Sequence, residues 1–176
     1  MILSRAGLDD LPRLIQFRTN AAAWLRTQGS DQWAEPFPAE HIANSIKANT
    51  VYLLRTSEQA DAAATITLDE DSDDLLWLPR ELQEPALFVH KLTVDRRYTG
   101  LNLGTELLNW ASTKAAHQGK QWVRLDAWTT NRHLQQYYER QGFQHVRTVH
   151  DPLVGGSGWV AQRRAAPAPF RFEDLT

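Results

Sequence analysis

The stretch Gly100-Leu101-Asn102-Leu103-Gly104-Thr105 has the residue types of a loop that binds phosphate through its main chain. It follows a strand-like segment that ends at Val94 and opens a segment with leucines at helical spacing. Glycine and asparagine tolerate positive φ, and the backbone N–H groups at a helix start attract anions. A merely structural turn fits the same residues. The stretch has no Gly-Lys-Ser/Thr ending of a nucleotide P-loop, and no GxGxxG pattern occurs.

A second pattern, Asn131-x-x-Leu134-x-x-x-Tyr138-x-x-x-Gly142-Phe143, lies further along the chain. Helical spacing places Asn131 and Tyr138 about two turns apart on nearly one face, so a capping residue and a phenol can address one elongated ligand. A phenol with a pKa of about 10 can donate a proton to a departing thiolate. The alternative is that Tyr138 is a buried aromatic residue that packs the helix on a sheet.

His90 lies in the strand-like segment that precedes the loop. By the period of two, it shares one face of the strand with Phe88, Leu92 and Val94. A histidine here can accept a proton from an amine near neutral pH. A structural histidine and a water relay are the alternatives.

The two patterns, in this order, resemble the GNAT superfamily of N-acetyltransferases. That family has Val-x-(three or four residues)-Arg/Gln-x-x-Gly-x-Gly/Ala after its fourth strand, and Asn-x-x-Ala-x-x-x-Tyr-x-x-x-Gly-Phe further on. Here Thr99 stands where the family prefers Arg or Gln, and Asn102 where it prefers Gly. Arg96 or Arg97 can supply the missing positive charge.

The resemblance implies acetyl-coenzyme A as cosubstrate, no metal, and a GNAT-like α/β acyl-CoA N-acyltransferase fold with a mixed, splayed sheet. It implies that the main chain at Leu92, Thr93 and Val94 binds the pantetheine arm, and that the pyrophosphate is held by Thr99, Gly100, Leu101, Asn102, Leu103, Gly104 and Thr105. It also implies that Asn131 binds the arm, that Tyr138 binds the sulfur and is the general acid, and that His90 is the base.

In the family, the acceptor cleft is usually walled by the segment that corresponds to residues 23–33. Trp24, Asp31 and Trp33 in that segment, together with Trp128, are therefore expected to bind a small polar-aromatic or cationic acceptor. Ordinary packing of these tryptophans is the alternative. Deprotonation at pH 7 costs about 4.6 kcal/mol for a lysine-like amine but about 1.4 kcal/mol for an α-amino group, so a low-pKa amine is the favoured substrate.

The composition excludes several classes of function. The 176 residues contain no cysteine, so disulfides, thiolate metal clusters and a cysteine nucleophile are ruled out. A net charge of −2 gives no general attraction to nucleic acid. No basic leader and no apolar run long enough for a bilayer are seen, so we expect a cytoplasmic protein that binds no membrane. The sequence leaves the oligomeric state open, and a homodimer is one such state.

The elements expected around these residues follow the order β, α, α, β, β, β, α, β, α, β, β, with about seven strands and about four helices. Pro36 and Pro38 are expected to break the chain before the second helix. The acidic run at residues 69–74 is expected to be a solvated loop. We expect one domain over residues 1–164 and an extended C-terminal tail over 165–176.

The function expected from the sequence is transfer of an acetyl group from acetyl-coenzyme A to a primary amine of a small molecule or peptide by direct attack. One alternative is a non-catalytic acyl-CoA-binding sensor. Another is a protein-modifying acetyltransferase, or an interaction domain, that docks basic partners on residues 69–74.

Overall fold

The computed structural model describes residues 1–35 and 37–176, so Pro36 lies outside the described residues. The chain forms two compact units. Unit 1 contains residues 1–68, 91–107 and 170–176, and unit 2 contains residues 69–90 and 108–169. Strand β4 (Ala86–Val94) and helix α4 (Leu103–His117) each contribute to both units.

The described strands form one mixed sheet in the order β6-β7-β5-β4-β3-β2-β1-β8. The pairs β1–β2, β2–β3, β5–β7 and β6–β7 are antiparallel, whereas β4–β5 and β1–β8 are parallel. The strand bounds are β1 Ile2–Arg5, β2 Val51–Arg55, β3 Ala62–Asp69, β5 Trp122–Ala127, β6 Gln144–Thr148, β7 Trp159–Arg164 and β8 Glu173–Asp174.

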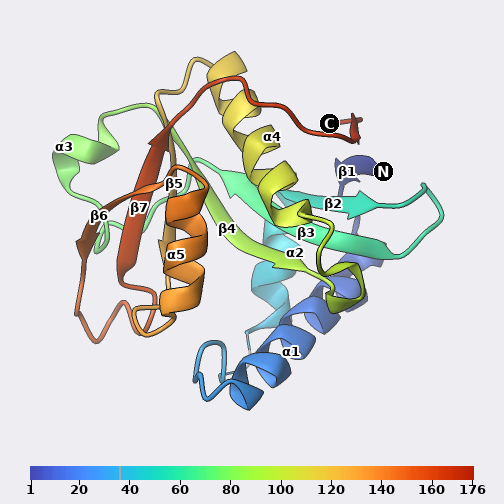
Figure 1. Cartoon of the computed structure of the whole chain (residues 1–176), viewed down its shortest axis with the longest axis horizontal. Coiled ribbons are helices and arrows are strands. Elements are labelled where there is room, and N and C mark those ends of the chain that lie inside the picture. Colours follow the sequence, from blue (N-terminus) through green and yellow to red (C-terminus); the bar gives the residue numbers. More distant parts are fainter. Residues whose placement is uncertain (36) are drawn as a thin grey trace. The chain divides into compact units, whose positions relative to one another are not determined.

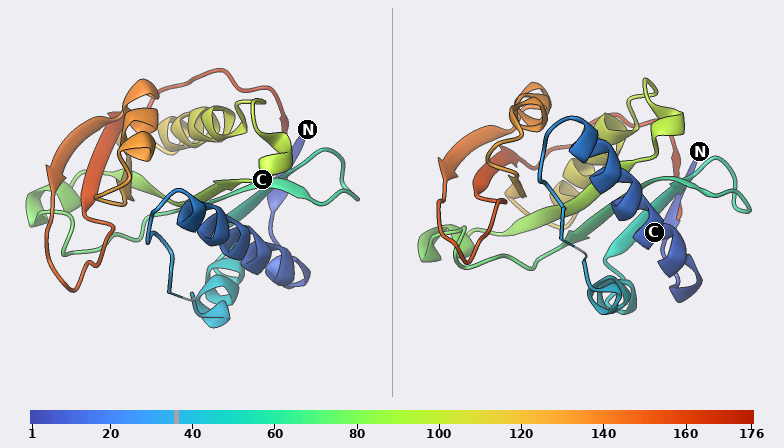
Figure 2. Two further views of the ribbon diagram at one scale, coloured as in Figure 1. Left: turned by 60° about the horizontal axis from the view of Figure 1, so that its bottom comes forward. Right: turned by 90° about the horizontal axis from the view of Figure 1, so that it is seen from below.

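In unit 1, helices α1 (Leu11–Thr27) and α2 (Ala39–Lys47) lie on one face of strands β1–β3 (Figures 1 and 2). Their apolar sides recur at helical spacing, and they bury Phe17 from α1 and Ile42 from α2 against Val51 and Leu53 of β2. Pro38 precedes α2 directly, where a fixed φ of −59° suits a helix start.

In unit 2, helix α5 (Arg132–Arg140) lies beside β7 in every view (Figures 1 and 2). A separate core cluster joins Trp77, Phe88 and Val160. Arg124 is fully buried in this unit, where its guanidinium lies over the Trp77 ring and pairs with Glu84. A buried arginine needs such partners because an unpaired buried charge is costly.

The expected mixed α/β architecture and order of elements are confirmed, and the structure adds four short elements. Helix α3 (Pro79–Leu82) interrupts the long connection before β4, 3-10 turns occupy Leu8–Asp10 and Arg96–Tyr98, and β8 lies near the end of the chain. The tail is extended over residues 165–171, as expected, but it is held along its length. Ser112 and Thr113 bond its main chain in unit 2, and β8 pairs with β1 in unit 1.

The expectation of a solvated acidic loop is wrong at its first residue. Asp69 ends β3, and its side chain is only 14% exposed because it lies against His90. Glu70 forms an ion pair with Lys120. Asp71, Asp73 and Asp74 are exposed, as expected of a run of like charges.

Candidate active-site residues

The loop between β4 and α4 lies in unit 1 and begins at an ion-paired aspartate. The Asp95 carboxylate accepts hydrogen bonds from Arg97 and from Arg13 of α1. These contacts hold the pKa of Asp95 far below its ordinary value, with the Arg97 hydrogen bond as the largest cause. The carboxylate also caps the 3-10 turn by accepting from the Arg97 N–H. The charge network therefore fixes the entry to the loop.

Two residues of this loop have left-handed backbones. Gly100 has a φ of 88° and Asn102 a φ of 56°, directly before α4 begins at Leu103. The first-turn N–H groups of α4 have no acceptor within the helix, and they carry the positive end of its dipole. Residues 99–102 are exposed, and no atom lies within 4 Å of the space beside Gly100. The loop therefore has the features of an anion-binding loop, and its binding of pyrophosphate remains a prediction.

The two arginines of the loop differ in their contacts. Arg97 is paired with Asp95, whereas the Arg96 guanidinium lies 4.4 Å from the centroid of the Trp24 ring on α1. The cation–π contact orients Arg96 without neutralising its charge. Arg96 is therefore the better source of the positive charge that Thr99 does not supply.

Strand β4 has an irregular backbone at the centre of the predicted pantetheine segment. Lys91 has a φ of 51°, which is unusual for a side chain other than glycine, asparagine or aspartate. Such a residue within a strand locally disrupts the ladder, and these irregularities are common beside active sites. Thr93 donates its hydroxyl to the carbonyl of Lys91 at 3.3 Å, which supports this local turn of the chain. Leu92 and Val94, the two neighbours of Thr93 in the chain, are half-buried.

His90, at the end of the unit 2 part of β4, has an acidic neighbour that is distant in sequence. Its Nε2 lies 3.2 Å from the Asp69 carboxylate and 3.2 Å from the main-chain oxygen of Asp71. Its ring stacks on Phe88 with the centroids 6.4 Å apart. A histidine held by a carboxylate in this way has a fixed orientation, as a general base requires.

Asp126 on β5 is a second carboxylate near His90, which the sequence analysis did not identify. Burial raises the pKa of Asp126, whereas the charge of His90 and a hydrogen bond from Ser157 lower it. The charge of Asp126 in turn contributes to raising the pKa of Tyr138. His90, Asp126 and Tyr138 are therefore electrostatically linked within unit 2.

Tyr138 lies on α5 and is 6% exposed. Its ring packs edge-on against Phe143 at 5.8 Å, so the packing role that we considered as an alternative is present. Burial, the largest cause, raises the pKa of Tyr138 well above its ordinary value. The phenol therefore holds its proton firmly, which favours hydrogen-bond donation over full proton transfer.

Asn131 caps α5, as expected: its side-chain oxygen accepts from the Leu134 N–H at 3.1 Å. The carbonyl end of the amide is thus engaged, and its NH₂ group is the end suited to a ligand carbonyl.

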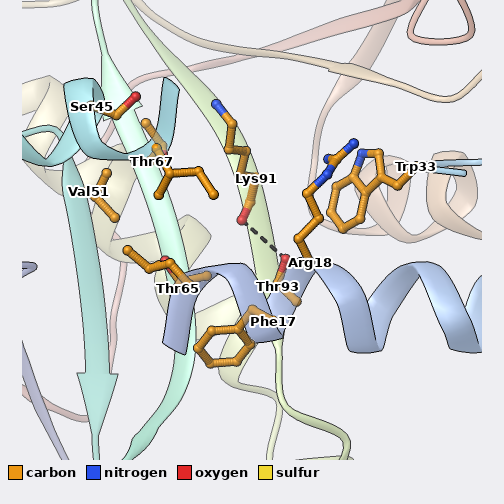
Figure 3. Close-up of a pocket in the computed structure, with 11 residues that line it drawn as sticks. Phe17, Arg18, Trp33, Ser45, Val51, Thr65, Thr67, Lys91 and Thr93 are labelled. Carbon is orange, nitrogen blue, oxygen red and sulfur yellow. Dashed lines mark hydrogen bonds between the residues drawn. The ribbon is translucent and has the colours of Figure 1, made fainter. Parts of the chain in front are cut away.

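The predicted acceptor residues of unit 1 have different surroundings. Trp33 lines a pocket of unit 1, where Arg18 lies over its ring, whereas Trp24 stacks with Arg96 and Asp31 is exposed (Figure 3). Trp128 belongs to unit 2, and its side chain fills the space beside Gly156, where an added Cβ would lie 2.2 Å from the ring. The pocket that Trp33 lines does not include Trp24 or Asp31, and a shared acceptor site remains a prediction.

Sequence reasoning missed Arg18, Lys91, Asp69 and Asp126 as functional candidates. Arg18 is on the inward side of an amphipathic helix. Helical spacing assigns this position to the buried face, where a cation is unusual, and this signal could have identified Arg18. The other three are recognisable only from contacts in three dimensions.

A mixed sheet with a left-handed loop opening a helix after its fourth strand, and a capped helix bearing a tyrosine, defines the fold class of acyl-CoA N-acyltransferases. The model of the acetyltransferase (GNAT) family matches residues 19–143, so the chain belongs to this family and is an acyltransferase. Enzymes of the family use acetyl-coenzyme A.

The relatives agree with this assignment. The uncharacterized N-acetyltransferase YesJ of Bacillus subtilis (strain 168) is 30% identical over 146 residues, which are 80% of each chain. A GNAT-family acetyltransferase of Listeria monocytogenes has a similar structure, with a TM-score of 0.76, 23% identity, and 92% and 93% of the two chains covered. The PaiA N-acetyltransferase of Thermoplasma acidophilum, solved with coenzyme A, has a TM-score of 0.67 at 17% identity, over 92% and 97% of the chains.

Two further findings concern the described part of the chain. None of its helices combines the length and apolarity needed to cross a bilayer. Its histidine and acidic side chains form no group of three or more that is suited to a metal ion.

Proposed function

We propose that the chain transfers the acetyl group of acetyl-coenzyme A to a primary amine of a small molecule or a peptide by direct attack of the amine. The observation that carries this proposal is the exposed loop at residues 99–102, with left-handed Gly100 and Asn102 before the first turn of α4. Such a loop offers several main-chain donors to a pyrophosphate in the field of a helix dipole.

The residues that would hold the cosubstrate are those expected from the sequence. The N–H groups of this loop would bind the pyrophosphate, apart from those of Thr99 and Leu101, which donate to the main-chain oxygens of Arg96 and Tyr98. Arg96 would be the nearby cation. The main chain at Leu92, Thr93 and Val94 would pair with the pantetheine amides in the manner of an added strand. The NH₂ group of Asn131 would serve the same arm. When bound, acetyl-coenzyme A supplies the thioester carbonyl that the amine attacks.

His90 is proposed to take the proton that the amine loses, directly or through a water molecule. The Asp69 carboxylate at 3.2 Å fixes the imidazole and stabilises its protonated form. A base of this kind is suited to an α-amino group, because the cost of deprotonating such an amine near pH 7 is about 1.4 kcal/mol rather than about 4.6 kcal/mol.

Tyr138 is proposed to donate a hydrogen bond to the sulfur as the C–N bond forms and the C–S bond breaks. Burial keeps its hydroxyl protonated at every pH at which the enzyme would work. A buried donor of this kind stabilises developing negative charge strongly because water does not compete for it.

The protein-docking alternative loses support from the acidic run. Asp69 is engaged with His90 and Glu70 with Lys120, so two of the acids have partners inside unit 2. The carboxylate of Asp73 accepts from the Leu75 N–H and so orders its own loop. Three of the five acids in the run are therefore accounted for by local structure.

The test is to follow free thiol release from acetyl-coenzyme A with a panel of amines that includes α-amino and ε-amino forms of the same compounds. We expect turnover with α-amino substrates and at least tenfold lower rates with ε-amino ones at pH 7. Tyr138→Phe is expected to lower kcat roughly tenfold or more, while calorimetry shows unchanged affinity for coenzyme A. Binding of coenzyme A without turnover of any amine would favour the sensor instead.

A further inference from the structure

A pocket in unit 1 lies between α1, α2 and the sheet, on the side of β4 that presents Lys91 and Thr93 (Figure 3). Most of its lining is apolar and comes from the helices and β2, with Leu14, Phe17, Ile42 and Val51. Its charged members are two cations, Arg18 of α1 and Lys91 of β4. The pocket therefore has a basic end and an apolar wall.

Arg18 has no acidic partner within the described residues. Its guanidinium lies over the Trp33 ring, 4.9 Å from the centroid (Figure 3), and it is 4.8 Å from the centroid of Phe37. Among residues 1–35 and 37–176, its one hydrogen bond is a long contact of 3.4 Å with the main-chain oxygen of Glu35. Burial lowers the pKa of Arg18, as expected of a cation withdrawn from water without a counter-charge. An arginine in this state can bind an anion bidentately.

Lys91 brings a second positive charge to the same aromatic ring. Its ammonium lies 4.9 Å from the centroid of Phe37, the ring that Arg18 also contacts. The left-handed backbone at Lys91 departs from the regular strand and sets the direction of this side chain. Trp33 is also left-handed, with a φ of 62°, a strained state for so large a residue. Strain at two members of one pocket is typical of a functional site.

The free volume in the pocket is about 30 Å³, which holds two water molecules or one small polar group, but not a whole substrate. A carboxylate is of this size, and it would meet the guanidinium at one end. The strand that carries Lys91 and Thr93 is also the one whose main chain is expected to bind the pantetheine arm. An acceptor anchored here would thus lie along the cosubstrate strand within unit 1.

We propose that Arg18, with Lys91, binds the carboxylate of the acceptor, so that the substrate is an amino acid or a related amino carboxylate. The inference rests on the proposed acetyl transfer and narrows its substrate class. It replaces the expectation of a cationic acceptor beside Trp33, because two cations at that position would repel such a ligand. The apolar wall favours a substrate with an aliphatic or aromatic side chain.

The test compares each of the common amino acids with its C-terminal amide, which removes the negative charge. Both are measured over a range of pH, because loss of the carboxylate also lowers the pKa of the α-amine. Thiol release with wild-type protein is expected to show a KM roughly tenfold or more lower for the acid than for the amide. Arg18→Gln is expected to remove most of this preference by raising KM for the acid alone, and Arg18→Lys to retain part of it. Arg26→Gln, an equal change of charge on the exposed side of α1, is the matched control. It should change neither the KM for the acid nor the KM for the amide.

Calorimetry separates failure of this inference from failure of the proposed function. N-acetyl amino acids and their amides are titrated into wild type, Arg18→Gln and Lys91→Gln in the presence of coenzyme A. Selective binding of the acids, lost in the variants, supports the carboxylate site even if no turnover is found. Equal binding or equal turnover of acids and amides would overturn it, whereas turnover of amines in general would leave the acetyltransferase proposal intact.

Discussion

The Nε2 atom of His90 lies 3.2 Å from the carboxylate of Asp69, although the two residues belong to different strands and are 21 positions apart. Neither side chain is fully exposed, since 27% of His90 and 14% of Asp69 is accessible. The Nε2 atom is thus engaged, and the carboxylate fixes both the ring orientation and the tautomer. If His90 is the base, Asp69 acts through it as a positioning residue.

We therefore expect Asp69→Asn to lower kcat roughly tenfold, because the imidazole loses the partner that orients it and stabilises its protonated form. KM for acetyl-coenzyme A should not change. Asp71→Asn is the control, since Asp71 contacts His90 through its main-chain oxygen and its side chain is exposed. Steady-state kinetics of both variants decide the matter: an equal effect of the two would show that Asp69 has no specific role.

A second prediction concerns the pH dependence of stability through Asp126. Its pKa is raised in the folded protein by burial, so the folded state binds more protons than the unfolded state above pH 4 or so. The contribution of Asp126 to stability is therefore lost as pH rises from about 4 towards neutrality. Asp126→Asn should remove this loss, so that the variant gains stability relative to wild type as pH rises. Urea unfolding of both proteins at pH 4.5 and pH 7 measures the difference in unfolding free energy. A variant that loses stability relative to wild type between these two pH values would contradict the assignment.

A third prediction tests the strained loop. Gly100 has a φ of 88° and open space beside it, so Gly100→Ala adds backbone strain without a collision, at a cost of about 1–2 kcal/mol. Gly7→Ala is the matched control, because Gly7 also has open space but a φ of −99°. We expect the first variant alone to lose stability in urea unfolding and to bind coenzyme A more weakly in calorimetry. Equal behaviour of the two would mean that the left-handed state is not required.

The sequence predicts most of the fold because its signals are local. Asn131 before a run with helical spacing predicts the cap and start of α5, and Gly119 predicts the end of α4, where the structure has a φ of 69°. The buried face of α4, from Leu103 to Ala115, also follows from spacing alone. Short elements such as α3 and β8 carry too few residues to show a period.

The contacts of the candidate site were less predictable because they join distant parts of the chain. The stacking of Arg18 on Trp33 and the approach of Asp69 to His90 depend on how helices and strands pack. The left-handed backbones of Lys91 and Trp33 oppose the intrinsic preference of these residues, so only tertiary contacts can impose them. The positions that local rules predict least well are therefore those that line the pocket of unit 1.

The last prediction concerns the ion pairs that hold the entry to the loop. The Asp95 side chain is 11% exposed and forms ion pairs with Arg13 and Arg97, which lower its pKa. Its stabilising effect is therefore fully present above the ordinary pKa of an aspartate, and it is lost progressively as pH falls below about 4. Asp95→Asn should cost about 2 kcal/mol of unfolding free energy at pH 7, and less at pH 3. Asp9→Asn, on an exposed turn, is the control and should change little at either pH.

Since Asp95 also caps the turn before the loop, coenzyme A binding should weaken in Asp95→Asn but not in Asp9→Asn. A stability loss with unchanged affinity would show that the ion pairs support the fold without shaping the loop.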